Sequence, residues 1–206
     1  MLKIKTLPGQ QVFFTSDYHE KHINLCRGTS NWPDKTGCRD FDTLEQMSDA
    51  VVAGHNKLVK PNDIVFNLGD IIFGDKTKLP EFLAKLSCKN IYFLMGNHDD
   101  WMNKESWAKE LFIKVWSFGA EVSINGKLFV LNHYPLKVWR DNNKGSIHLF
   151  GHTHSSLPDD PHARSLDVGV DGCAYSHQKF SPWSFDEVLD VCYNKKSAFK
   201  ALDHHR

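Results

Sequence analysis

The chain has 206 residues, enough for one sizeable core and too few for two, so a single domain over residues 1–206 is expected. Lys plus Arg and Asp plus Glu both number 25, and this balance offers no net attraction toward nucleic acid, an anionic membrane or a basic partner. No apolar run approaches the roughly 18 to 20 residues of a membrane span and the amino terminus lacks the apolar core of a signal peptide, which predicts a cytoplasmic protein.

The first half of the chain alternates short apolar runs with helical patterns. Strands are predicted at 11–16, 63–68 and 91–95, because continuous apolar runs bounded by Gly, Asn, Asp or Pro are typical of strands covered on both faces. Asp42 and Glu45 are predicted to form a capping box that opens a helix through about Leu58, and a second helical pattern runs from Leu79 to Leu86. This order favours a parallel sheet with helical crossovers.

The second half changes character. Asn125-Gly126 between two alternating runs predicts a hairpin, with strands at 128–132 and 147–150, a further strand in SLDVGVD and a helix from about Ser184 to Tyr193. Mixed sheets in an α/β sandwich fit both halves. Residues 195–206 are expected to form a flexible tail. The five cysteines are odd in number and include no Cys-x-x-Cys pair, which predicts reduced, mostly structural thiols.

A long loop, 25–41, is rich in Gly, Pro and Asp and follows the first polar cluster directly. Loops of this length in compact domains are often functional lids. A disordered insertion is the alternative interpretation, and the sequence leaves both open.

Polar residues of the kinds that bind metal ions follow each of the five main predicted strands. In open α/β sheets the carboxyl edge of the strands is where ligands bind. Pairs separated by two residues point to the same side in extended chain, and Gly69, Gly96 and Gly151 allow sharp turns beside a crowded centre. The candidates are, in chain order, Asp17, His19, Asp70, Asn97, His98, Asp99, His133, His152 and His154.

Taken singly, each cluster has an ordinary explanation: Asp17 and Asp70 as helix caps or turn residues, His133 as a surface histidine, and the glycine motifs as turns. Five such clusters in one order favour a shared site instead. Seven carboxylate, carboxamide and imidazole candidates exceed what one tetrahedral metal site uses. They suit two ions that share a bridging carboxylate, the usual arrangement for displacement at phosphorus.

The ordered set Asp-x-His (17, 19), Gly-Asp (69, 70), Gly-Asn-His-Asp (96–99), His133 and Gly-His-x-His (151–154) resembles the calcineurin-like metallophosphoesterase superfamily, over about residues 13–154. The resemblance implies a four-layered α/β-β/α sandwich of two mixed sheets flanked by helices. It implies a dinuclear centre whose first metal is held by Asp17, His19 and His154, whose second is held by Asn97, His133 and His152, and whose bridging ligand is Asp70.

The same resemblance implies that a metal-bridging hydroxide attacks phosphorus. His98 would be the general acid for the leaving oxygen, or a donor that stabilises its charge, with Asp99 orienting the imidazole. A finer resemblance, carried by DYHEKHIN and VGVDGCAYSHQKFSPWSFDEV, is to a branch of small bacterial and phage phosphoesterases. It implies that His22 and Asn24 face the substrate, and a surface helix is the alternative.

The chain departs from the superfamily pattern after Gly-Asp. Many members continue with a polar residue and an Arg that steadies phosphate, whereas this chain has Phe73 and Gly74. Loop cations that follow the ligand segments are candidates to replace that Arg, although solvated surface charge is the ordinary interpretation of each. These candidates are Arg27, Arg39, Lys137 and Arg140.

The expected activity is metal-dependent hydrolysis of small phosphomonoesters or phosphodiesters, including nucleotides stacked on Trp32 or Trp101. A nuclease of the same superfamily is the second hypothesis, against which zero net charge and the absence of a basic aromatic stripe argue. A catalytically silent metal-binding scaffold is the third, against which the complete ligand set and His98 argue. The expected cofactors are two divalent ions, manganese first, with Fe, Zn, Ni or Co as alternatives.

Overall fold

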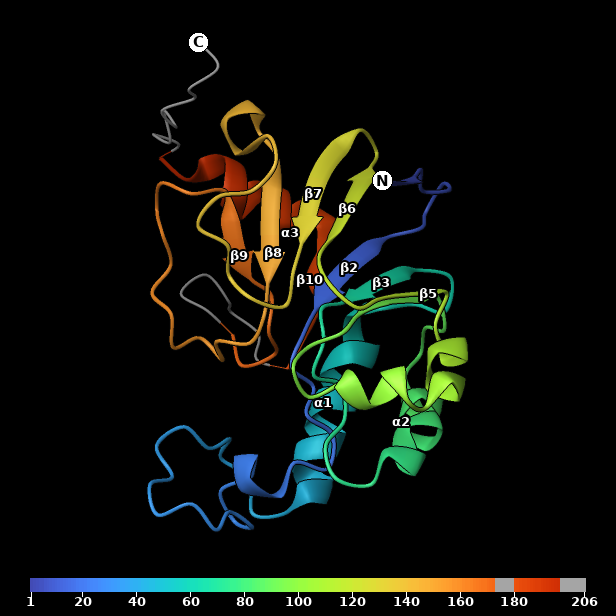
Figure 1. Ribbon diagram of the computed structural model, residues 1–206, viewed down its shortest axis with the longest axis vertical. Helices are drawn as coiled ribbons and strands as arrows, with labels where there is room; N and C mark the ends of the chain where they lie inside the picture. Colours follow the sequence, from blue (N-terminus) through green and yellow to red (C-terminus); the bar gives the residue numbers. More distant parts are fainter. Residues whose placement is uncertain (173–179, 197–206) are drawn as a thin grey trace.

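Two facing five-stranded sheets with helices around them make up the fold, seen in a computed structural model that describes residues 1–172 and 180–196 (Figure 1). The first sheet has the order β1 (Leu2–Ile4), β6 (Ala120–Ile124), β7 (Lys127–Leu131), β8 (Ile147–Phe150) and β9 (Ser165–Asp167). The second has the order β10 (Trp183–Ser184), β2 (Val12–Thr15), β3 (Ile64–Asn67), β4 (Ile91–Leu94) and β5 (Lys114–Trp116). Two mixed sheets with flanking helices confirm the predicted sandwich.

Most strand pairs are parallel, which gathers the carboxyl ends of several strands at one edge of each sheet. β2, β3, β4 and β5 run parallel, and only the short β10 pairs antiparallel with β2. In the other sheet β7, β8 and β9 run parallel, while β6 and β7 form the predicted hairpin. Its turn places Asn125 and Gly126 at φ of 48° and 82°, the left-handed conformation that an Asn-Gly turn adopts.

Helices α1 (Leu44–Leu58) and α2 (Leu79–Lys85) pack on the second sheet, and both begin within two residues of their predicted starts. The capping box of α1 lies one residue later than predicted. The Thr43 hydroxyl accepts a hydrogen bond from Gln46 N, and the Gln46 side chain accepts one from Thr43 N. Asp42 therefore lies outside the box, and its own N–H also donates to Gln46. Short 3₁₀ turns occur at Ile23–Leu25, Lys76–Lys78, Asp100–Asn103, Ser106–Leu111 and Asn142–Lys144.

The strands of the second sheet are apolar on both faces because each face is covered. Phe13 packs toward the helices, whereas its neighbour Phe14 packs between the sheets. There its ring stacks on Phe66 and Phe129, with centroids 5.7 and 5.2 Å apart. Helix α3 (Phe185–Asn194) lies within one residue of its predicted bounds, is capped by Ser184 and adds Val188 and Cys192 to this core between the sheets. The continuous apolar runs of the sequence thus reflect double coverage.

The long loop 25–41 is closed at its base. Cys26 and Arg39 form an isolated bridge, Arg39 N donates to Leu25 O at 2.7 Å, and Arg27 N donates to Arg39 O at 3.0 Å. Cys26, Cys38 and Cys88 are free thiols, as predicted, and Cys192 is buried in the core. Cys173 and residues 197–206 of the predicted tail 195–206 lie outside the described residues. Lys195, the first residue of that predicted tail, is buried and pairs with Asp159, so the prediction is wrong there. Over the described residues, no helix is both long and apolar enough to cross a bilayer.

Two buried histidines are expected to make stability depend on pH. Burial lowers the pKa of His55 and of His148 to about 4, and His148 is held neutral because its Nε2 accepts Leu136 N while its Nδ1 donates to Val130 O. Below pH 6.5 the unfolded chain takes up protons on both rings and the folded chain does not. The free energy of unfolding should therefore decrease as pH falls from 7 toward 4, by on the order of 3 kcal/mol for each ring.

Urea unfolding at pH 7 and pH 4.5 measures this loss. His148→Gln isolates the share of one ring, because glutamine does not titrate, and the variant should lose less stability on acidification than the wild type. Equal losses in the two proteins would show that His148 does not carry the effect.

Candidate metal centre

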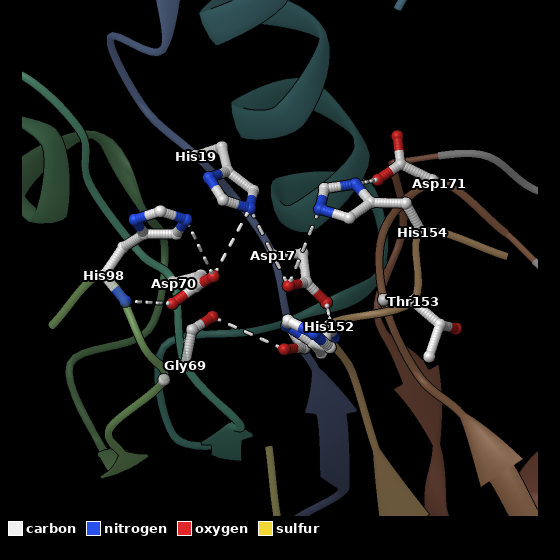
Figure 2. Close-up of polar contacts among 12 residues, drawn as sticks. Asp17, His19, Gly69, Asp70, His98, His152, Thr153, His154 and Asp171 are labelled. Carbon is white, nitrogen blue, oxygen red and sulfur yellow. Dashed lines mark hydrogen bonds and ion pairs between the residues drawn. The ribbon is translucent and has the colours of Figure 1, made fainter. Parts of the chain in front are cut away.

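The predicted ligands come together where the carboxyl ends of both sheets meet (Figure 2). Asp17 N donates to Gly69 O at 2.9 Å, which ties the chain after β2 to the chain after β3. Gly151 N donates to His133 O at 3.0 Å, which does the same for β8 and β7. The strand order thus makes one cluster from residues up to 137 positions apart, Asp17 and His154 being the extremes.

Backbone strain is concentrated in this cluster. Five of the seven predicted ligands have positive φ, a conformation that costs non-glycine residues free energy and is found mainly at functional sites. The values are 60° for Asp17, 51° for His19, 56° for Asp70, 69° for His152 and 46° for His154. The fold maintains these conformations because they direct the side chains toward one point.

Two of the predicted glycines are required by crowding. A Cβ on Gly96 would lie 2.2 Å from Asp70 Oδ1, and a Cβ on Gly151 would lie 2.5 Å from Asp17 Oδ2. Any larger residue at either position would displace a carboxylate of the cluster.

The ligand atoms form two groups, Asp17 with His19 and His154, and Asp70 with His133 and His152. Within each group the atoms lie within 4.8 Å of one another. Asp70 Oδ2 lies between the groups, 3.6 Å from His19 Nε2 and 3.4 Å from His133 Nε2. Asn97, the remaining predicted ligand, places Oδ1 3.1 Å from His133 Nε2. The structure therefore brings the seven candidate ligands of the sequence together in one place.

Buried polar atoms without partners show that a cation fits here. Asp17 Oδ1 and both ring nitrogens of His19 are buried and make no hydrogen bond. Burying such atoms unpaired costs about 1–3 kcal/mol each, and a bound cation would remove that cost at the carboxylate oxygen and one ring nitrogen. Carboxylate, amide and imidazole donors without thiolate suit hard and borderline divalent ions.

The central carboxylate stays charged even though it is buried. Burial disfavours the ionised form of Asp70, but the hydrogen bond and charge of His133, together with His19, outweigh it and lower the pKa of Asp70 to about 2. His133 shows the reciprocal effect: burial opposes its charge, but Asp70 and Asp17 raise its pKa to about 9. Burial raises the pKa of Asp17 to about 6. A divalent ion would replace the proton on His133 as counter-charge to these carboxylates.

Two of the imidazoles are held in the tautomer that a metal ligand needs. His133 Nδ1 lies 2.8 Å from Leu68 O, and His154 Nδ1 lies 2.7 Å from Asp171 Oδ2. Because a carbonyl or a carboxylate can only accept, each Nδ1 carries the proton. Each Nε2 is thereby left as the lone-pair donor, and it faces a carboxylate of the cluster.

Asp171 is a site residue that the sequence prediction missed. Arg39 donates to both of its oxygens, at 2.7 and 2.9 Å, and also to Asp17 O and Tyr18 O. The guanidinium is buried and held by these four hydrogen bonds. The prediction that Arg39 anchors phosphate is therefore wrong. Asp171 follows the apolar run Val168-Gly169-Val170, and a polar residue directly after an apolar run is the sequence signal that marked the candidate ligands.

Two of the remaining cation candidates do not reach the cluster, and Arg27 only borders it. Arg27 pairs with Asp40 at 2.9 Å and lines a second cavity that His154 and Asp171 also line, whereas Arg140 pairs with Glu121 at 2.5 Å. Lys137 lines a separate cavity. Position in a loop after a ligand segment does not determine where the loop goes, and residues 136–139 fold against the first sheet instead.

Two further predictions need correction. The Asp99 carboxylate accepts hydrogen bonds from Asp70 N at 2.6 Å and from Gly96 N at 2.9 Å. It therefore fixes the turns at Asp70 and Gly96 rather than the imidazole of His98. Burial and the nearby charge of Asp70 raise the pKa of Asp99 to about 7. Trp101 packs beside Trp107 against the helix-side core and not at the cluster.

His98 lies at the edge of the cluster, beside a cavity of about 370 Å³. Its side chain is 39% exposed, and its Nε2 lies 4.0 Å from Asp70 Oδ2. The cavity also brings His22 and Asn24 to the site, as predicted, together with Trp32 from the long loop. An acid with access both to the cluster and to solvent can deliver a proton to a leaving group that enters from this cavity.

Asp171→Asn is expected to weaken metal binding by roughly 10–100-fold, the usual effect of removing a carboxylate that orients a ligating histidine. Titration calorimetry of Mn²⁺ into the metal-stripped protein measures the affinity, and urea unfolding monitors the fold separately. Asp49→Asn, at an exposed position of α1, is the matched control. Unchanged affinity in a folded Asp171→Asn protein would show that the contact serves stability alone.

Two known proteins are similar to this chain over most of its length. The chain is 28% identical over 188 residues to the uncharacterized protein MJ1445 of Methanocaldococcus jannaschii, covering 88% of this chain and 91% of that protein. It is 26% identical over 187 residues to the gene 66 protein of Mycobacterium phage L5, covering 77% and 86%.

A crystal structure of the protein of unknown function AQ665 from Aquifex aeolicus has a similar fold, with a TM-score of 0.60, 20% identity and coverage of 89% of this chain and 100% of that one. Residues 11–179 match the sequence model of calcineurin-like phosphoesterases, which confirms the resemblance. The chain therefore belongs to the calcineurin-like phosphoesterase family.

Proposed function

We propose that the chain is a dinuclear-metal-dependent phosphoesterase that hydrolyses small phosphomonoesters or phosphodiesters. The observation that supports this most strongly is the pair of ligand groups with the charged Asp70 between them. Two ions held there would activate a water molecule and neutralise charge that develops on the phosphate oxygens. Asp17, His19 and His154 would hold one ion, Asn97, His133 and His152 the other, and Asp70 both.

The protein's own groups divide the remaining tasks. His98 is placed to protonate the leaving oxygen or to stabilise its charge, because it is exposed to the cavity and its backbone N–H donates to Asp70 Oδ1 at 3.0 Å (Figure 2). That hydrogen bond fixes the main chain of His98 to the central carboxylate. Asp99 and Asp171 act as positioning residues, the first for the ligand turns and the second for the His154 ring.

Manganese is the proposed metal, with iron, zinc, nickel and cobalt as alternatives that the donor set also suits. We place the protein in the cytoplasm and propose a small phosphorylated molecule as its binding partner.

Hydrolysis of 4-nitrophenyl phosphate and bis(4-nitrophenyl) phosphate tests the function. Protein stripped of metal and reloaded separately with Mn, Zn, Ni or Fe should hydrolyse at least one ester, and the stripped protein should not. The faster ester distinguishes a monoesterase from a diesterase, and a single-stranded oligonucleotide offered under the same conditions tests the nuclease alternative. Binding of two ions without turnover of any of these would favour a scaffold.

A further inference from the structure

The cavity beside His98 has aromatic walls. The indole of Trp32 meets the ring of His22 edge-on at 5.9 Å between centroids, and Phe73 packs on the same histidine at 4.0 Å. Phe73 also contacts His98 edge-on at 4.9 Å. The walls come from three separate segments, and the rings run without a break from the rim at Trp32 to the edge of the metal cluster.

The lining of the cavity is aromatic and imidazole in character, without a lysine or an arginine. The lining residues are His19, His22, Asn24, Leu25, Trp32, Phe73, His98 and His154. His22 Nδ1 accepts a hydrogen bond from Leu25 N at 2.9 Å, so that nitrogen carries no proton. A leaving group with a phosphate of its own would find no lysine or arginine in this lining, whereas an uncharged one would bury apolar surface.

Polar groups among the rings are oriented by the main chain. Asn24 Oδ1 accepts Asn31 N at 3.0 Å, which leaves the amide nitrogen of Asn24 as the donor on offer. With Nδ1 of His22 occupied, its Nε2–H is also a donor. Flat faces with two donors suit an aromatic ring that carries acceptor atoms.

We propose that this pocket binds an uncharged leaving group that carries a planar aromatic ring, as in benzyl phosphate or a nucleoside monophosphate. This inference rests on the proposed phosphoesterase function and specifies its substrate class. Trp32, Phe73 and His22 supply the apolar surface that the ring packs against, and the ester oxygen lies toward His98. Trp32 is 41% exposed, so the long loop contributes this wall without making it part of the core.

Benzyl phosphate and ethyl phosphate are the test pair, since both release primary alkoxides and differ in the ring. The wild type should prefer benzyl phosphate. Trp32→Ala should lower kcat/KM for benzyl phosphate about tenfold, mainly through KM, because the bound ring loses one stacking face. The kcat/KM for ethyl phosphate should change less than twofold in Trp32→Ala. Trp32→Phe should restore most of the kcat/KM lost for benzyl phosphate. Phe118→Ala, which removes an aromatic ring that is 86% exposed and outside the pocket, is the control.

A nucleoside 5′-monophosphate assayed in the same way separates the two sources of an aromatic ring. The faster substrate identifies the leaving group, and a Trp32-dependent KM for either supports the pocket. Equal losses for benzyl and ethyl phosphate in Trp32→Ala, or no loss for any aromatic ester, would overturn the proposal while leaving the phosphoesterase function intact.

Binding of non-hydrolysable benzylphosphonate and ethylphosphonate to the metal-loaded protein keeps the two proposals distinguishable. If no ester is hydrolysed, the phosphoesterase proposal fails, but tighter binding of benzylphosphonate that is lost in Trp32→Ala would still support the pocket. Equal binding of the two phosphonates would overturn it.

Discussion

Asp70→Asn is expected to leave at most one divalent ion bound per chain and to lower phosphate-ester hydrolysis by about 10³-fold, or ~4 kcal/mol of transition-state stabilisation. Asp70 Oδ2 is the atom that lies within 3.6 Å of ring nitrogens from both ligand groups, so an amide there removes the charge common to both ions. Asparagine keeps the size of the side chain and one oxygen, which limits the change to charge and coordination.

Metal content by mass spectrometry and steady-state kinetics on the same samples test this expectation. Asp75→Asn, at an exposed aspartate in the connection that follows Asp70, is the matched control and should retain two ions and full activity. An Asp70→Asn protein with two tightly bound ions and wild-type kcat would refute the bridging role.

His98→Ala is expected to lower kcat about 10²–10⁴-fold while both ions remain bound. The imidazole belongs to neither ligand group, and its side chain is 39% exposed toward the cavity, so its loss should spare the metals and the fold. If His98 assists departure of the leaving oxygen, an alkyl ester should lose more rate than a nitrophenyl ester, because a nitrophenolate needs little protonation.

His162→Ala, at an exposed histidine away from the cluster, is the control for this comparison. Loss of metal from His98→Ala would assign it a ligand role instead. Equal rate losses for the alkyl and nitrophenyl esters would exclude a role in leaving-group departure.

The sequence predicted which side chains gather at the site because the signal is local to each strand end. Asp17 and Asp70 each follow an apolar run, and parallel pairing of β2 with β3 brings such ends together whatever the intervening length. Asp171 follows an apolar run too, but it binds a histidine rather than joining a ligand group, so its role is visible only when His154 Nδ1 is seen 2.7 Å away.

Long-range partners explain the predictions that failed. Arg39 looked like a free loop cation, but Asp171, 132 residues further along the chain, takes up its guanidinium. Asp99 sits next to His98 in sequence, yet the close turns at Asp70 and Gly96 offer backbone N–H groups that it accepts instead. The aromatic pocket could not be predicted as a unit, since Trp32 and Phe73 meet across His22 only in the folded chain.

Titration of the metal-stripped protein with Mn²⁺, with hydrolysis and bound metal followed together, tests the central claim most directly. A dinuclear phosphoesterase predicts that hydrolysis is absent without metal, rises as the ligand groups fill and reaches its maximum at two ions per chain. Hydrolysis by the metal-free protein, or its full rate at one ion per chain, would contradict a mechanism that needs both ligand groups.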